Sequence, residues 1–302
     1  MKNKRKFSKQ IIIGIVIIGF IFFHFYVPRF ITEIKNPIVN LIKPNKYKEK
    51  TILEKQHLFF NSFDDTKLSY FFLYSSIGNT KGTIILLHGI RSSKEHFITL
   101  SNKLSRLGYN VVALDLRAHG KSEGVHCTFG VKEKKDVSAL ITMLLMQGKI
   151  NKNIGIWGQS LGGAIGLQAM AFDSRIKFGI IESTFSNFRT VTHDYFNFHL
   201  GFNIRPFTNY LIDRSGKIAN FNPEDAKPIK YCEKITQPIL LVHGNKDQRI
   251  SIDYARRNLE KISSKHKELI EIKNATHLNV WEIGGNNYFQ KVKTFLNKTS
   301  VK

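Results

Sequence analysis

The sequence predicts an α/β fold, with a mostly parallel β-sheet flanked by helices and an N-terminal transmembrane helix before it. From Thr83 onward, short apolar runs alternate with segments of helical spacing, the pattern of parallel strands joined by crossover helices. A Gly-x-Ser-x-Gly stretch follows one apolar run and opens a helical segment. Near the N-terminus lies an apolar stretch long enough to cross a bilayer.

The N-terminal segment carries the membrane signal. Residues 11–27 are 17 residues without Lys, Arg, Asp or Glu, and a helix of that length reaches ~26 Å, near the lower limit for spanning a bilayer. Residues 1–10 are richer in Lys and Arg than the residues just after the span, which predicts a cytoplasmic N-terminus and an extracytoplasmic main domain. A cleaved signal peptide is the alternative. The apolar run ends without a small-x-small cleavage site, which favours an uncleaved signal-anchor.

A juxtamembrane linker over residues 28–53 is expected next, followed by one large domain over residues 54–302. Residues 55–75 suggest a β-hairpin that turns near Asp64 and Asp65. Further strands are expected at 83–88, 110–115, 153–157, 177–182, 238–243 and 267–272.

Two helices and a cap are expected among these strands. Ser92 to Glu95 has the pattern of a capping box, which would open a helix that ends near Leu107. Residues 131–147 also have helical spacing. The alternation stops at residues 185–233, which predicts a small cap over the site, with aromatic side chains that either line a substrate pocket or pack the cap. These aromatic residues are Phe185, Phe188, Tyr195, Phe196, Phe198, Phe202, Phe207 and Tyr210.

The Gly-x-Ser-x-Gly stretch runs from Gly158 to Gly162, between an apolar run and a helical segment. Glycines two residues before and two after Ser160 let the backbone close around a tight strand-to-helix turn. Ser160 is therefore the candidate nucleophile, although a turn serine that caps a helix could share the pentapeptide. A serine hydroxyl also needs a histidine base, an acid that orients the base, and donors for an oxyanion.

The acid and the base are expected in loops that follow later strands. Asp247 is the candidate acid, Glu182 is the alternative, and Asp253 fits the acidic first turn of a helix. Two histidines follow Asp247, and His266 lies among charged residues typical of a surface. His277 is the candidate base, because it completes the chain order Ser, Asp, His.

The oxyanion donors are expected to be backbone N–H groups. Leu161 follows the nucleophile directly, and Ile90 follows Gly89, which allows a sharp turn after a strand. His88 and His243 also precede glycines at strand ends. Both lie upstream of the position where the base belongs, so we interpret both as structural.

With these motifs in order, residues 54–296 resemble the α/β-hydrolase superfamily, in particular the branch of monoglyceride lipases, membrane-tethered esterases and serine aminopeptidases. Ala118 departs from this family's usual Asp-x-Arg-Gly-His-Gly pattern. The resemblance implies an α/β-hydrolase fold with a cap and a triad of Ser160, Asp247 and His277. It rests on His88-Gly89, the stretch from Asp115 to Ser122, Gly158 to Gly162, His243 to Asp247 and the His277 loop.

Composition and charge bear on which partners and cofactors the protein is expected to have. A formal net charge of +23 would favour nucleic-acid binding, but the lysines are scattered and no nucleic-acid-binding motif is present, so no nucleic-acid partner is expected. Attraction to anionic lipid and plain compositional bias remain as explanations of the charge. Cys127 and Cys232 form no disulfide framework, although pairing between them stays open. Without a Cys/His cluster of metal-ligand spacing, neither a metal nor a cofactor is expected.

The sequence therefore predicts a single-pass, membrane-anchored serine hydrolase. Its substrate would be a small-molecule ester, lipids included, cleaved through an acyl-enzyme as in a carboxylesterase or lipase. One alternative is an aminopeptidase or small-peptide hydrolase with the same triad. The other is a membrane-bound binding protein that uses the hydrolase fold without catalysis.

Overall fold

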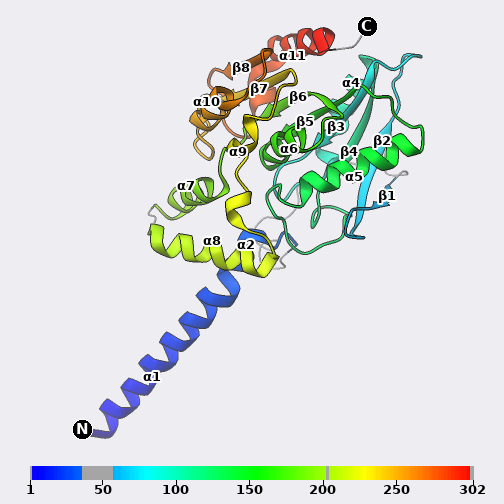
Figure 1. Cartoon of the computed structure of the whole chain (residues 1–302). Helices are drawn as coiled ribbons and strands as arrows, with labels where there is room; N and C mark the ends of the chain where they lie inside the picture. Colours follow the sequence, from blue (N-terminus) through cyan, green and yellow to red (C-terminus); the bar gives the residue numbers. More distant parts are fainter. Residues whose placement is uncertain (1, 36–56, 202–203, 300–302) are drawn as a thin grey trace.

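The computed structural model describes residues 2–35, 57–201 and 204–299. A twisted sheet with helices on both faces forms the body, and one long helix extends away from it (Figure 1). The strands are β1 (Leu58–Asn61), β2 (Lys67–Leu73), β3 (Gly82–Leu87), β4 (Tyr109–Leu114), β5 (Ile154–Gln159), β6 (Ile176–Glu182), β7 (Ile239–Gly244) and β8 (Lys267–Ile272). The α-helices are α1 (Lys2–Ile21), α2 (Val27–Thr32), α4 (Ile98–Arg106), α5 (Glu133–Met146), α6 (Leu161–Phe172), α7 (Phe188–Leu200), α8 (Arg205–Ala219), α9 (Ile229–Cys232), α10 (Ile252–Lys261) and α11 (Val280–Thr299). Shorter helical turns are the π-helical η1 (Phe22–Tyr26) and the 3₁₀ turns η3 (Lys94–Phe97) and η4 (Pro223–Asp225).

The sheet has eight strands in the order β1-β2-β4-β3-β5-β6-β7-β8. β1, β2 and β4 pair antiparallel, and all pairs from β4 to β8 are parallel. The prediction of a mostly parallel α/β sheet is confirmed, and each predicted strand is found with its ends shifted by at most a residue or two.

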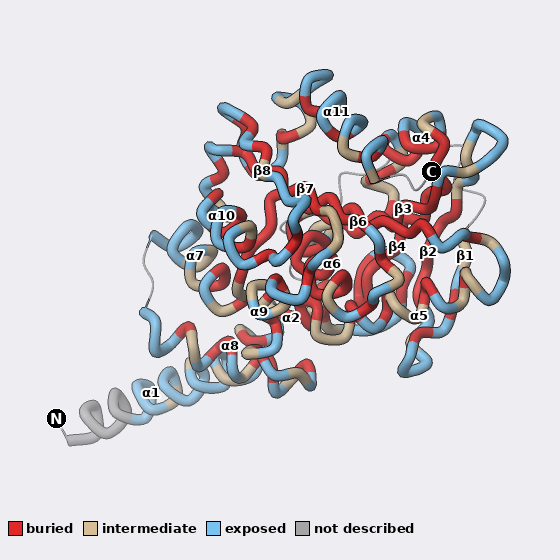
Figure 2. The backbone as a smooth tube through the Cα atoms, turned by 45° about the horizontal axis from the view of Figure 1, so that its top comes forward, coloured by how far each residue is buried: buried red, intermediate tan, exposed pale blue. Residues whose placement is uncertain are grey.

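Both faces of the sheet are buried, as continuous apolar strands require. In β4, Val112 and Leu114 point into one apolar cluster, whereas Val111 and Ala113 point into the other. Helices α5, α6 and α10 cover the first face, and α4 and α11 cover the second. Figure 2 shows the strands as the buried centre of the molecule, between helices with exposed outer surfaces.

The strand order explains where a site can form. After β3 the chain crosses to β4 on one side, and β5 is then added on the other side of β3. In parallel sheets, ligands bind at the carboxyl ends of the strands where the order reverses in this way. The loops that follow β3 and β5 therefore flank the expected crevice.

The predicted apolar N-terminal helix is present. Gln10–Thr32 has a mean hydropathy of 2.5 and is long and apolar enough to cross a membrane. It comprises the end of α1, the turn η1 and the short helix α2.

The predicted linker over residues 28–53 differs from the structure at its start. Its first residues are helical in α2, and the Cys127 N–H donates to the Thr32 carbonyl at 2.8 Å. This part of the chain is thus folded onto the domain by nonlocal contacts that its composition does not indicate. Residues 36–53 lie outside the described part of the chain.

The predicted capping box does not form as expected. Ser93 occupies the N-cap of η3 without a side-chain cap hydrogen bond. Instead Asp115, which follows β4, accepts from the Lys94 backbone N–H at 2.8 Å and also from the Lys94 ammonium. A carboxylate from a distant strand end therefore takes the place of the local cap, and Asp115 and Lys94 form a buried ion pair.

We expect Lys94→Met to destabilise the protein by about 3–5 kcal/mol, because it leaves the buried Asp115 carboxylate without its cation. Denaturant unfolding of the full-length protein in detergent, followed by tryptophan fluorescence, measures this change. Lys152→Met, at an exposed lysine, is the matched control. A loss of less than ~1 kcal/mol for Lys94→Met would contradict the role of the ion pair.

Candidate active site

Ser160 lies in a strained turn between β5 and α6. Its backbone has φ 54° and ψ −115°, a conformation that an L-residue keeps only when its surroundings enforce it. Two hydrogen bonds hold the turn from the neighbouring strand end: the Ser160 N–H donates to the Glu182 carbonyl at 2.8 Å, and the Thr184 hydroxyl donates to the Ser160 carbonyl at 2.8 Å.

The glycines around Ser160 are required by close backbone contacts. A Cβ at Gly158 would lie 2.2 Å from the Gly162 carbonyl oxygen, and a Cβ at Gly162 would lie 1.9 Å from the Leu87 carbonyl oxygen. The second contact brings the end of β3 against the first turn of α6. The Gly-x-Ser-x-Gly pattern thus has the steric origin that the sequence suggests.

The structure brings Ser160, His277 and Asp247 together. His277 Nε2 lies 3.0 Å from Ser160 Oγ, and His277 Nδ1 lies 2.7 Å from Asp247 Oδ2. His277 comes from the loop between β8 and α11, and Asp247 from the loop after β7. All three are buried in the domain. Both distances are within hydrogen-bond reach, so the arrangement can move a proton from a hydroxyl to an imidazole oriented by a carboxylate.

Asp247 is held as an ionised acceptor. Burial alone would raise its pKa, but hydrogen bonds from His243 and His277 and from the backbone of Ile250 outweigh burial and lower the pKa. The second carboxylate oxygen, Oδ1, accepts from the N–H groups of Arg249 and Ile250 at 3.0 and 2.9 Å. A carboxylate with this many donors keeps its charge and its orientation.

His243 is a contact of the candidate acid that sequence reasoning missed. We interpreted it as structural, and its buried Nε2 does donate to the Ile250 carbonyl at 2.8 Å. The same nitrogen also lies 3.3 Å from Asp247 Oδ2. The signal available in the sequence was the spacing of four residues between His243 and Asp247 across a tight turn after β7.

Glu182, the alternative acid, is engaged elsewhere. Its carboxylate accepts from the indole N–H groups of Trp157 at 3.0 Å and Trp281 at 2.9 Å, and from the Tyr288 hydroxyl. Burial raises the pKa of Glu182 to about 7, against these hydrogen bonds, which lower it. Glu182 therefore supports the Ser160 turn through its backbone carbonyl, and its side chain is directed to two tryptophans and a tyrosine.

The candidate oxyanion donors flank Ser160. Ile90 and Leu161 line the same cavity as Ser160, and Leu161 is the first residue of α6, where an N–H has no acceptor within the helix. A Cβ at Gly89 would lie 3.6 Å from Ser160 Cβ, so the loop after β3 passes close to the serine. The oxyanion role of Ile90 and Leu161 stays a prediction.

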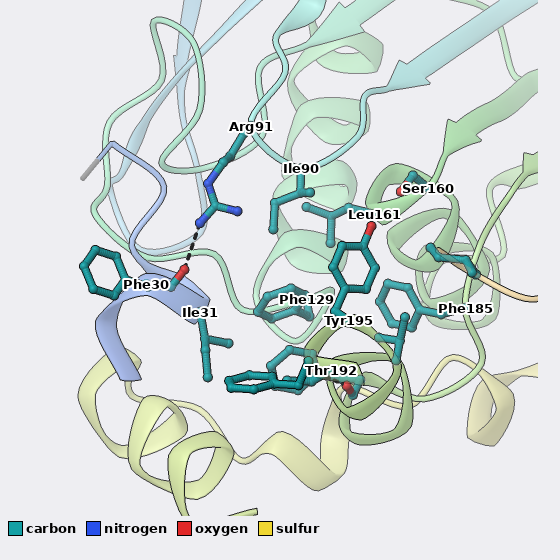
Figure 3. Close-up of a pocket in the computed structure, with 14 residues that line it drawn as sticks. Phe30, Ile31, Ile90, Arg91, Phe129, Ser160, Leu161, Phe185, Thr192 and Tyr195 are labelled. Carbon is teal, nitrogen blue, oxygen red and sulfur yellow. Dashed lines mark hydrogen bonds between the residues drawn. The ribbon is translucent and has the colours of Figure 1, made fainter. Parts of the chain in front are cut away.

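An apolar cavity of about 190 Å³ opens beside Ser160. Arg91 is the one charged side chain among the described residues that line it. Figure 3 shows Ser160 on one side of the pocket and Phe30 and Ile31 on the other, with Ile90 and Tyr195 between them. The segment between β6 and β7, where we predicted a cap, contributes Phe185, Phe188, Val191, Thr192, Tyr195 and Phe196.

The remaining predicted cap aromatics have other positions. Phe198, Phe207 and Tyr210 are exposed and do not line this cavity, and Phe202 lies outside the described residues. In the described part of the chain, no group of three or more His, Cys, Asp or Glu side chains could hold a metal ion. Cys127 and Cys232 are both buried, and neither forms a disulfide.

Comparison with known proteins shows which fold this architecture is similar to. A family model described as the α/β hydrolase fold matches residues 82–203. The uncharacterized protein YqkD of Bacillus subtilis is 24% identical over 264 residues, which make up 80% of this chain and 83% of that protein. Thiohydrolase aneE of Aspergillus aculeatus is 32% identical over 119 residues, 36% of this chain and 37% of that protein. The solved structure of the Pyrococcus furiosus esterase Pf2001 matches with a TM-score of 0.69 at 23% identity, over 82% of this chain and 91% of that one.

The environment of Glu182 predicts a pH dependence of stability. Its pKa is raised from 4.5 to about 7 in the folded protein, so between these values the folded state binds a proton that the unfolded chain releases. Stability therefore falls as the pH rises through this window, by up to about 3 kcal/mol. Glu182→Gln removes the titration, and the difference in unfolding free energy between wild type and variant should change across the window.

Unfolding in detergent at a series of pH values from about 4.5 to 8 measures this difference. Glu260→Gln, at an exposed glutamate of α10, should give a curve parallel to the wild type. Parallel curves for Glu182→Gln and the wild type would contradict the raised pKa.

Proposed function

Because the chain is an α/β-hydrolase-fold protein, we propose that it is a membrane-anchored serine hydrolase that cleaves carboxylic esters through an acyl-enzyme. The observation that carries the proposal is the position of His277, 3.0 Å from Ser160 Oγ and 2.7 Å from Asp247 Oδ2. This arrangement borders an apolar pocket suited to an acyl chain.

The positions of Ser160, His277 and Asp247 suggest how the serine would be acylated. Ser160 Oγ attacks the ester carbonyl carbon, and His277 Nε2 accepts the hydroxyl proton while Asp247 stabilises the imidazolium that forms. The N–H groups of Ile90 and Leu161 donate to the oxyanion. As the tetrahedral intermediate collapses, the bond from carbon to the alcohol oxygen breaks, and His277 gives its proton to the leaving alcohol.

Deacylation repeats the sequence with water. His277 accepts a proton from the water as its oxygen attacks the acyl carbon. When the bond to Ser160 Oγ breaks, the proton returns to the serine and the carboxylic acid leaves. The chain's own residues therefore supply the base, the acid and the nucleophile.

The pocket favours an ester over a peptide substrate. An aminopeptidase would need carboxylates near the site to bind a free α-amine, and the described residues that line this cavity include none. Carboxylates of the predicted cap are engaged elsewhere: Asp194 accepts from the Tyr254 hydroxyl, and Asp213 and Glu224 pair with Arg189. A peptidase with the same triad is the second candidate, and a non-catalytic binding protein is the third.

The apolar helix supports membrane anchoring. Gln10–Thr32 has the length and composition of a membrane span, and basic residues are concentrated on its N-terminal side. We propose a single-pass anchor that leaves the N-terminus in the cytoplasm and the hydrolase domain outside it. The competing assignment, a cleaved signal sequence, differs by the loss of α1 from the mature protein.

Ser160→Ala should abolish labelling by a fluorophosphonate probe and lower ester turnover by several orders of magnitude, since it removes the nucleophile. His277→Ala should lower turnover similarly, and the double variant should be hardly worse, because such residues act as a unit. Turnover of p-nitrophenyl esters by the purified full-length protein measures these effects. His266→Ala, at an exposed histidine, is the matched control. Substantial ester turnover by Ser160→Ala would overturn the assignment, and absent labelling and turnover in the wild type would favour the binding protein.

The proposed anchor predicts whether the protein is found in the membrane fraction or in the soluble fraction. The full-length chain should stay with membranes after a high-salt or carbonate wash, and deletion of residues 1–26 should release a soluble domain that keeps α2. Protease added to spheroplasts should digest the hydrolase domain. Release of the full-length chain by salt alone would indicate surface adsorption through lysines, and protection from protease would reverse the topology.

A further inference from the structure

The end of the membrane anchor is folded into the hydrolase domain. Helix α2 continues from α1 and η1, and the Arg91 guanidinium donates to the Phe30 carbonyl at 2.8 Å. Beyond α2, the Ile34 N–H donates to the Val125 carbonyl at 3.3 Å, and the Lys35 ammonium donates to the Ser122 carbonyl at 2.7 Å. The first bond ties α2 to the loop after β3, and the other two tie the residues that follow α2 to the segment between β4 and α5.

The same segment delivers a wall of the pocket. Phe129 lies in this segment, two residues after Cys127, whose N–H donates to the Thr32 carbonyl, and it lines the cavity together with Phe30 and Ile31. Ile31 is half-buried and packs against the main apolar cluster. In Figure 3, Phe30 and Ile31 stand across the pocket from Ser160.

The anchor also contacts helix α8, through residues of η1 that precede this wall in the chain. The ring of Phe23 lies 5.3 Å from that of Phe207, and His24 Nδ1 bonds to the Tyr210 hydroxyl. Figure 1 shows α8 lying across the end of the long helix. The pocket is therefore built where the membrane-spanning segment enters the domain.

We propose that the anchor is part of the substrate-binding site: Ile31 and Phe30 form the far wall of the acyl pocket and set the acyl length that fits. This inference rests on the proposed ester hydrolysis at Ser160. The substrate class is an ester with an apolar acyl chain, held where that chain can lie against the end of the membrane helix. An acyl group bound to Ser160 extends toward α2, and each methylene that the wall excludes costs about fourfold in kcat/KM.

Two opposite substitutions test the wall in the full-length protein in detergent, with p-nitrophenyl esters of increasing acyl length kept below their micelle thresholds. Ile31→Trp fills the pocket and should move the optimum of kcat/KM to shorter chains, by roughly fifteenfold between esters that differ by two methylenes. Ile31→Ala opens the pocket and should move the optimum to longer chains. Ile18→Trp and Ile18→Ala are the matched controls, at an exposed isoleucine of α1, and should leave the profile unchanged.

A chemical variant covers the case in which Ile31→Ala or Ile31→Trp fails to fold. Ile31→Cys treated with alkyl methanethiosulfonates of increasing length forms a mixed disulfide with release of the sulfinate, and each longer alkyl group should progressively exclude the longer esters. Cys127 and Cys232 are buried, so modification is directed to the new thiol.

The outcomes separate the inference from the proposed function. If the wild type shows neither fluorophosphonate labelling nor ester turnover, the proposed function fails, and the inference with it. If labelling and turnover are present but the acyl-length profile is the same in wild type, both Ile31 variants and modified Ile31→Cys, the inference alone is overturned. A profile that shifts with Ile31 and not with Ile18 supports it.

Discussion

The strand-to-helix turn at Ser160 is the constraint on which the rest of the site depends. Its positive φ costs about 1–3 kcal/mol, and the turn is sterically possible because Gly158 and Gly162, where a Cβ would clash with the backbone, carry no side chain. Hydrogen bonds with the last residue of β6 and with Thr184 just beyond it fix the same turn from the neighbouring strand. The parallel strands β7 and β8 end at the same edge of the sheet, so the loops with Asp247 and His277 meet the serine there.

Two carboxylates near this edge have opposite surroundings, and these surroundings favour Asp247 over Glu182 as the acid of the proposed triad. Asp247 receives four hydrogen bonds or close N–H contacts, two from histidines and two from backbone N–H groups, and its pKa is lowered. Glu182 is enclosed by aromatic side chains, and burial raises its pKa to about 7. An ionised carboxylate can stabilise an imidazolium, whereas a carboxyl that titrates near neutrality does so less well. Residue type and loop position alone left both acids as candidates in the sequence.

The features that could be predicted are those that depend on neighbouring residues. The strands follow from continuous apolar runs, and the Ser160 turn follows from the spacing of its glycines. The order of Ser160, Asp247 and His277 then indicated which loops would meet. Contacts between distant segments could not be predicted, because they leave no periodic signal in the sequence. The Asp115 carboxylate takes the place of the local cap of η3, and the backbone N–H of Cys127 donates to the Thr32 carbonyl. The backbone at Ala118 was not predicted either. Ala118 has a φ of 65°, a conformation that favours glycine, which is the residue of the family pattern at this position.

The contacts of α2 tie the apolar N-terminal helix to the rest of the domain. A flexible linker would let the domain turn freely above a bilayer, whereas here the helix that fits a membrane span is continuous with residues bonded to the loop after β3 and to the segment between β4 and α5. Under the proposed membrane anchoring, these contacts would fix the orientation of the domain toward the membrane. A wall of the pocket beside Ser160 belongs to the same helical segment. Under the proposed anchoring, the attachment of the protein to the membrane and the shape of its pocket would therefore depend on one structural element. If the helix is the proposed anchor, a change in α2 would alter both properties together, while a change confined to the exposed face of α1 would alter membrane attachment alone.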